Sequence, residues 1–169
     1  MALSICAVFS CTKNDNETNG GNEPGGGGGE PQGSYVDLGL PSGTKWKNAN
    51  EENSADAEYD FYTYDEAIAA FGDKLPTKEQ CEELKAECQW TWNGSGYEVT
   101  GPNGNSISLP AADCRLCSGD VYGVGSGGYY WSSTPSGSEF AWILRFDSGS
   151  VGVSVNRRCC GQSVRLVQD

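Results

Sequence analysis

Apolar and polar side chains alternate strictly over residues 141–156, and this pattern limits the fold more than any other feature of the chain. Side chains along a β-strand point to opposite faces with a period of two. A turn at 147–150 divides the pattern, so it predicts an antiparallel hairpin with one buried face. The apolar positions expected to face inward are Trp142, Leu144, Phe146, Val151, Val153 and Val155. The intervening positions expected to face outward include Ile143, Arg145, Asp147, Gly152 and Ser154.

Shorter patterns elsewhere predict two helices and several more strands. A helix is expected over 64–71, where Gly72 ends it, and a second over 75–85, where Thr77 and Gln80 have the spacing of a capping box. Strands are expected within 35–46, at 90–92, at 97–100, at 107–109 and, buried, at 163–167. Together these elements predict a small α+β domain with a mostly antiparallel sheet and a C-terminal hairpin.

The N-terminal residues differ in composition from the rest of the chain. Residues 2–10 form an apolar run that is too short to span a bilayer and is typical of a signal peptide. The run ends at Cys11 in a sequence that resembles a lipobox, so 1–11 are expected to be a partial lipoprotein signal with a lipidated Cys11. An ordinary signal peptide with a chance cysteine is the alternative.

Residues 12–33 carry scarcely a large apolar side chain and include a run of five glycines. Such a composition cannot form a core, so we expect a disordered tether ahead of a domain over 34–169. These features predict a lipid-anchored protein of the outer membrane, exposed at the cell surface and touching the membrane only through its anchor.

Charge and the lack of histidine narrow the function. The net charge is −12, with 23 acidic and 11 basic residues, which disfavours binding to nucleic acid. The chain has no histidine, so the commonest general base and the commonest ligand of catalytic zinc are both missing. We therefore expect a binding protein rather than an enzyme, with no cofactor and no metal.

Six short blocks, in order, resemble the Fibrobacter succinogenes major paralogous domain family. They lie at 35–46, 75–80, 100–107, 109–112, 129–134 and 161–167. The resemblance implies a C-type-lectin-like fold in a secreted or lipid-anchored protein of gut Bacteroidetes. A subset of the family resembles the variable proteins of diversity-generating retroelements, in which adenine positions of a C-terminal repeat are randomised. Asn156 is the single asparagine after residue 106, and loss of asparagine is what that process leaves.

The resemblance implies a diversified face that binds a surface ligand, such as a protein or glycan of another cell, a phage or a host. The implied positions are Cys114, Leu116, Cys117, Phe140, Ile143, Arg145, Asp147, Gly152, Ser154, Arg157, Cys159 and Cys160. Arg115, Arg158 and Arg165 match fixed positions of the family and are expected to be structural. The chain departs from the family at Asp113, where glycine is usual. A non-variable domain with a structural, pilus-associated or glycan-binding role is the alternative function.

The cysteines allow several interpretations. Cys81 and Cys88 are ~10 Å apart along a helix, too far to form a disulfide, and are expected to face the core. Cys114, Cys117 and the 159–160 pair favour surface cysteines with a disulfide among them, and the pairing stays open. A four-thiolate zinc site has poor spacing at the vicinal pair, and a redox motif lacks its usual βαβ context.

The aromatic residues do not predict sugar binding. The acidic-Pro-Asn and Trp-Asn-Asp motifs of calcium-dependent lectins are missing from the sequence. Trp131 and Trp142 are expected to belong to the core rather than to form a ligand platform.

Overall fold

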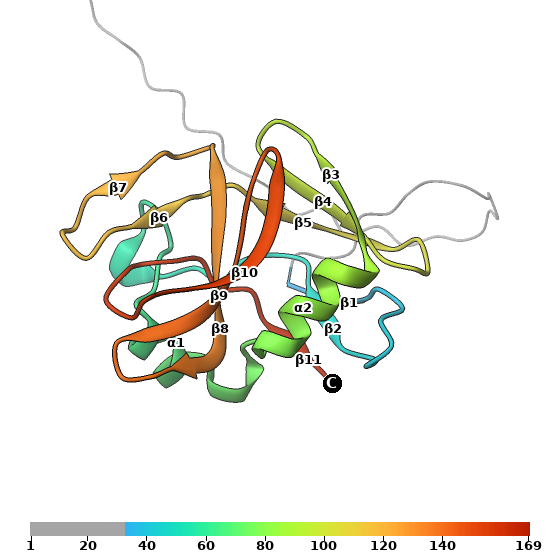
Figure 1. The fold of residues 1–169 in the computed structure, drawn as a ribbon, viewed down its shortest axis with the longest axis horizontal. Helices are drawn as coiled ribbons and strands as arrows, with labels where there is room; N and C mark the ends of the chain where they lie inside the picture. The colour runs from blue at the N-terminus through green and yellow to red at the C-terminus, as the bar shows by residue number, and fades with distance from the viewer. Residues whose placement is uncertain (1–32) are drawn as a thin grey trace, which may run out of the picture.

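The computed structural model describes residues 33–169, so Cys11, the signal segment and all of the tether except Gly33 lie outside the described part. Figure 1 shows two short helices packed among small sheets, which confirms the α+β class. The helices are α1 (Tyr64–Phe71) and α2 (Lys78–Glu87), with 3₁₀ turns at Ser54–Asp56 and Gly72–Lys74. The strands are β1 (Tyr35–Asp37), β2 (Lys45–Lys47), β3 (Gln89–Trp92), β4 (Gly96–Thr100), β5 (Ser106–Pro110), β6 (Cys114–Arg115), β7 (Val121–Tyr122), β8 (Gly127–Ser136), β9 (Phe140–Asp147), β10 (Ser150–Arg157) and β11 (Val167–Gln168).

The strands form four small antiparallel sheets. Their orders are β1-β2-β11, β10-β9-β8, β3-β4-β5 and β6-β7. The first sheet pairs the start of the domain with its end, because β2 lies between β1 and β11. Within residues 33–169, no helix is long and apolar enough to cross a membrane.

Both helices begin as the sequence predicts. Thr63 and Thr77 cap α1 and α2, and each helix has a complete capping box with Glu66 or Gln80 as the third residue. The capping side chains satisfy backbone N–H groups that the first helical turn leaves without partners. The capping box at Thr77 is the one that the sequence predicted, and the box at Thr63 is an addition that the structure reveals.

The hairpin forms in the predicted register, with Leu144 opposite Val153 and Trp142 opposite Val155. The prediction of a single buried face is wrong, because the sheet β10-β9-β8 lies between two clusters of buried side chains. One cluster contains Leu144, Phe146 and residues of α2, and the other contains Ile143 and residues of α1.

Two hairpin residues are therefore placed opposite to expectation. Ile143 is only 1% exposed, because Trp131 of β8 and Tyr64 and Ala67 of α1 belong to its cluster. Val155 is 40% exposed and belongs to neither buried cluster. Burial of the second face needs β8 and α1, and neither is visible in the two-residue period of 141–156.

The final segment also differs in part from its prediction. Residues 163–167 are buried, as expected, but only Val167 belongs to a regular strand. Ser163 forms an isolated parallel bridge with Tyr130, which ties the segment to β8. Trp131 is fully buried, as predicted, whereas Trp142 is half-buried beneath the Lys78 ammonium group.

Candidate functional site

Four cysteines from two distant segments converge at one end of the domain. Cys117 and Cys159 form a disulfide, with Cα atoms 5.2 Å apart and a sequence separation of 42. The Cys160 Sγ lies 3.5 Å from the Cys117 Sγ. Cys114 is buried as a free thiol, and burial raises its pKa to about 11. The disulfide fixes the pairing that the sequence left open.

A backbone bridge holds these two segments together beside the disulfide. Arg115 and Gly161 exchange two N–H···O bonds, each 2.8 Å long. A Cβ at Gly161 would lie 3.1 Å from the Cβ atoms of both Arg115 and Phe61, a tight contact that favours glycine at this close approach. The stretch after Ala112 therefore lies beside the chain that leaves β10.

Asp113 has an unusual backbone conformation for a residue with a side chain. Its backbone adopts φ 65°, a left-handed conformation that strains most residues but is tolerated by Asp and Asn. Its buried carboxylate accepts a 3.0 Å hydrogen bond from the Ser126 hydroxyl. Burial raises the pKa of Asp113, while the hydrogen bonds to Ser126 and to backbone N–H groups lower it.

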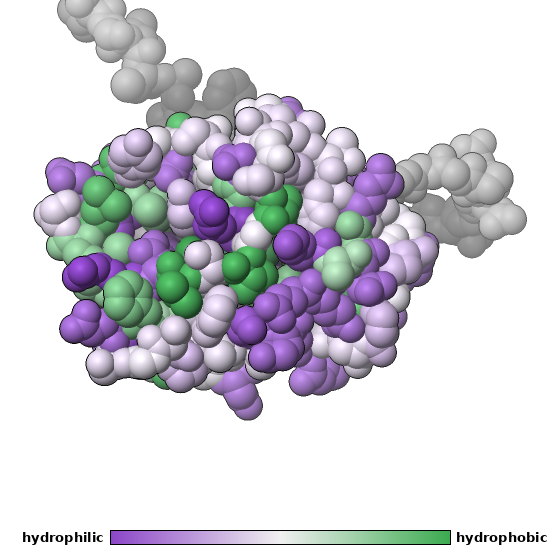
Figure 2. Space-filling view, viewed as in Figure 1, coloured by the Kyte–Doolittle hydropathy of each residue, from purple (hydrophilic) through white to green (hydrophobic). Residues whose placement is uncertain are grey.

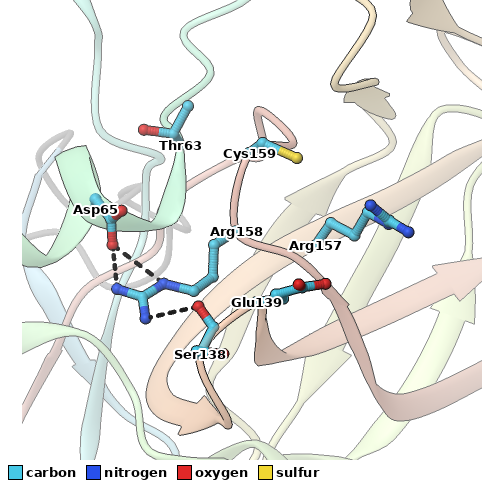
Figure 3. Close-up of a pocket in the computed structure, with 7 residues that line it drawn as sticks. All are labelled: Thr63, Asp65, Ser138, Glu139, Arg157, Arg158 and Cys159. Carbon is cyan, nitrogen blue, oxygen red and sulfur yellow. Dashed lines mark hydrogen bonds and ion pairs between the residues drawn. The ribbon is translucent and has the colours of Figure 1, made fainter.

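Two hollows open on either side of Cys159, and Figure 3 shows the side chains of the larger one. The larger hollow, of about 460 Å³, is lined by Thr63, Asp65, Ser138, Glu139, Arg157, Arg158 and Cys159. The smaller, of about 300 Å³, is lined by Asn53, Ala55, Asp56, Phe61, Thr63, Glu66, Arg115, Cys159 and Gly161. Thr63 and Cys159 line both, so the disulfide stands at the junction of the hollows.

Two arginines hold the walls of these hollows in place. Arg158 is paired with Asp65, donates to the Ser138 carbonyl and stacks over the Tyr64 ring (Figure 3). Arg115 donates a 2.6 Å hydrogen bond to Asp56. These contacts agree with the structural role expected of both arginines.

Arg157 is placed differently from its neighbours. Its guanidinium lies 5.8 Å from the centre of the Phe140 ring, and none of the ion pairs among residues 33–169 involves it. Figure 3 shows it extending away from Arg158. Arg157 is therefore available to a ligand.

Exposed apolar side chains border the same region. Leu116 is 40%, Tyr122 67% and Val124 63% exposed, and all three lie on or beside the β6–β7 hairpin. Figure 2 shows apolar residues gathered over this hairpin and over the β9–β10 hairpin, with hydrophilic residues between them. The sequence did not single out Tyr122 or Val124, although apolar residues within a glycine-rich loop were a usable signal.

The predicted face divides into three groups. Leu116, Cys117, Phe140, Arg157 and Cys159 surround or adjoin the disulfide, and we call them, with Tyr122 and Val124, the disulfide face. A second group on the hairpin remains at least partly exposed: Arg145, Asp147, Gly152 and Ser154. The third group is buried, and for it the prediction of an exposed binding position is wrong: Cys114 (5% exposed), Ile143 (1%) and Cys160 (5%).

The Asp147 side chain is exposed, but it forms hydrogen bonds within the β9–β10 turn. Its carboxylate accepts hydrogen bonds from the Gly149 N–H at 2.9 Å and from the Ser150 hydroxyl at 3.1 Å. The bond from Gly149 is the main reason why the pKa of Asp147 lies below its usual value. Its side chain thus stabilises the β9–β10 turn.

The cysteines also form the one group of metal-ligand type found within residues 33–169. The sulfur atoms of Cys117, Cys159 and Cys160 lie within 4.8 Å of one another. Two of these sulfurs are bonded to each other, so in this state only Cys160 offers a thiol. A thiolate zinc site needs several unoxidised cysteines, so the disulfide form does not provide one.

Comparison with known proteins gives a family model but no function. Residues 103–167, which include β6 to β10, match the model of a domain of unknown function (DUF8237). The chain has no match among curated proteins or among solved structures.

Proposed function

We propose that this chain is a ligand-binding protein of the cell surface that uses the disulfide face as its recognition surface. The observation that carries the proposal is that the Cys117–Cys159 disulfide and the Arg115–Gly161 bridge join segments 114–124 and 157–161 beside two hollows. A disulfide and a backbone bridge fix these segments, so the surface is organised before a ligand arrives. Preorganisation of this kind lowers the entropic cost of binding.

The chemistry of the disulfide face favours a protein ligand. Arginine and aromatic side chains are enriched at the centres of protein interfaces, and this face presents Arg157, Phe140 and Tyr122. Exposed Leu116 and Val124 add apolar surface beside them. Neither hollow is lined by an exposed aromatic ring on which a sugar would stack.

The proposal includes a location outside the cytoplasm, with a lipid anchor at Cys11 and a C-type-lectin-like fold. The disulfide supports this location, because disulfides persist in oxidising compartments and are rare in the cytosol. Strand β2 pairs with both β1 and β11, which joins the first and last strands of the domain. This arrangement supports a domain attached through an N-terminal tether.

Burial refines the proposed diversification of the C-terminal region. Nine of the twelve implied positions are at least partly exposed: Leu116, Cys117, Phe140, Arg145, Asp147, Gly152, Ser154, Arg157 and Cys159. Substitution at the buried positions Cys114, Ile143 and Cys160 disturbs packed core, so variation there conflicts with folding.

Deep sequencing of the gene from a growing bacterial population tests this directly. We expect amino-acid substitutions to concentrate at the nine exposed codons, with fewer and more conservative changes at the three buried ones. A near-identical repeat downstream, with adenines at these codons and a neighbouring reverse-transcriptase gene, is expected as the source of the changes. Substitutions spread evenly over 33–169 would contradict diversification.

Binding measurements with a ligand isolated by screening cells, phage and host proteins against the full chain test the surface itself. Arg157→Ala and Tyr122→Ala should each weaken binding by about tenfold or more, as truncation of an interface anchor does. Lys85→Ala, an exposed change on α2, should leave the affinity unchanged. If Lys85→Ala weakens binding while Arg157→Ala and Tyr122→Ala do not, the recognition surface lies elsewhere.

A further inference from the structure

A third sulfur lies beside the disulfide. The Cys160 Sγ is 3.5 Å from the Cys117 Sγ, and it also lies within 3.7 Å of the Asn156 side-chain oxygen. Cys160 is 5% exposed, while its neighbour Cys159 is exposed and stands at the junction of the two hollows. The buried Cys160 thiol and the exposed Cys159 sulfur are therefore adjacent in sequence and compete for a bond to the Cys117 sulfur.

The other described thiols are poor candidates for reaction with this disulfide. Cys81 and Cys88 belong to α2 and its end, and both pack with a core cluster that contains none of the cysteines at the disulfide. Burial raises the pKa of Cys114 to about 11, which keeps it as an unreactive thiol. Cys160 is the free cysteine whose sulfur directly contacts the disulfide.

We propose that Cys117, Cys159 and Cys160 form a thiol–disulfide exchange site, in which Cys160 displaces Cys159 from Cys117 and the released Cys159 reacts with a small-molecule disulfide. This site is independent of the recognition of a protein ligand by the disulfide face, although the two share Cys117 and Cys159.

The first step is an isomerisation without net oxidation. The Cys160 sulfur, as thiolate, attacks the Cys117 Sγ, the bond between Cys117 and Cys159 breaks, and a bond between Cys117 and Cys160 forms. Cys159 leaves as a thiolate and takes up the proton that Cys160 lost. In the structure the Cys160 Sγ lies to the side of the Cys117–Cys159 bond and not along its extension. Rotation about the Cys160 Cα–Cβ bond must therefore align the sulfur for attack.

The second step is the reaction of Cys159 with an external disulfide, RSSR. The Cys159 thiolate attacks one sulfur, a mixed disulfide Cys159–SR forms, and RS⁻ leaves. Over both steps one protein thiol is oxidised and the small disulfide is reduced. The hollows beside Cys159, of about 460 Å³ and 300 Å³, are in the size range of small-molecule sites.

Alkylation of the folded full chain followed by peptide mapping tests the exchange. The purified chain is treated with N-ethylmaleimide without reductant and digested with trypsin, which cleaves after Arg115, Arg145, Arg158 and Arg165. The peptide 159–165 remains disulfide-linked to the peptide 116–145, and fragmentation between residues 159 and 160 shows which cysteine carries the alkyl group. We expect the alkyl group on Cys159, with Cys160 in the disulfide. An alkyl group found on Cys160 alone, or no alkylation of the linked pair, would overturn the proposal.

Matched cysteine variants supply the control. Cys160→Ser and Cys160→Ala should each lower the rate of alkylation at Cys159 by at least about tenfold, because no thiol remains to displace it. Cys114→Ser removes the neighbouring buried thiol and should leave that rate unchanged. Cys159 labelling that persists in both Cys160 variants would overturn the proposal. The linked peptides of the wild-type chain are mapped in parallel, so that the variants are judged against the folded protein.

Oxidised glutathione serves as the small-molecule disulfide in the second arm. We expect a glutathione adduct on Cys159 of the wild-type chain and its loss in Cys160→Ser. An adduct on Cys160 or Cys114 in place of Cys159 would overturn the assignment of the reacting sulfur. Neither arm depends on an identified protein ligand, so failure here leaves the proposed recognition function standing, and the reverse also holds.

Discussion

Arg165→Met should lower the free energy of unfolding by about 3–5 kcal/mol, because it leaves several buried acceptors without a donor. Arg165 is 1% exposed and lies between three parts of the chain. Methionine fills much of the same volume, so the loss reflects hydrogen bonding more than packing. The expected result is a large fall in the urea midpoint with little change in the slope.

The expected loss follows from what Arg165 holds. Its guanidinium donates to the Lys47 carbonyl and the Ser108 carbonyl, both at 2.8 Å, and makes two bonds to the Asn50 side-chain oxygen, at 2.9 and 2.6 Å. Methionine has no donor, so these acceptors would be left buried without partners, and each such group costs roughly 1–3 kcal/mol. The bonds also join the end of β2 to β5 through the segment before β11.

Burial explains why the whole network matters more than a single bond. Desolvation lowers the pKa of Arg165, while its interactions with Tyr130 and then with the Glu51 carboxylate oppose that change. Arginine nevertheless stays protonated in proteins, so the carbonyls must balance a full charge in the interior.

Two variants separate this explanation from simple loss of charge. Arg165→Lys keeps the charge but cannot reach three acceptors with a planar fork, so it should also be clearly destabilised. Arg145→Met removes an exposed arginine and should change stability by no more than about 0.5 kcal/mol. If the free energy of unfolding of Arg165→Met stays within about 1 kcal/mol of wild type, then backbone rearrangement or solvent satisfies the acceptors that Arg165 leaves.

The parts of the fold that sequence predicted well are those that depend on neighbours along the chain. The start of α2 follows from Thr77, whose capping hydrogen bonds reach only three residues. The hairpin register follows from the two-residue period and a short turn. Both are decided before any long-range contact forms.

The parts that sequence did not predict depend on long-range packing. Cys117 and Cys159 lie close enough to bond because the Arg115–Gly161 bridge brings their segments together, and spacing alone could not select this pair. The larger hollow needs Thr63 before α1 and Arg157 at the end of β10 to meet. Tertiary contact, and not local pattern, places these residues.

The hairpin gives the clearest test of the difference between the pattern and the structure. The two-residue period places Val155 inward and Ile143 outward, but Ile143 is 1% exposed and Val155 is 40% exposed. Ile143→Ala should therefore lower the free energy of unfolding by about 2–5 kcal/mol, because it empties packed volume between β9 and α1. Val155→Ala should cost less than about 1 kcal/mol, since much of its side chain already contacts solvent.

The same measurement with neighbouring residues makes the result decisive. Leu144→Ala, which opens the other core cluster, should cost as much as Ile143→Ala, because β9 is covered on both faces. Arg145→Ala should stay within about 0.5 kcal/mol, since Arg145 is exposed. Urea denaturation of the four variants under one set of conditions compares them directly. If Val155→Ala is strongly destabilised and Ile143→Ala is not, the simple one-faced hairpin is correct, and α1 does not cover β9.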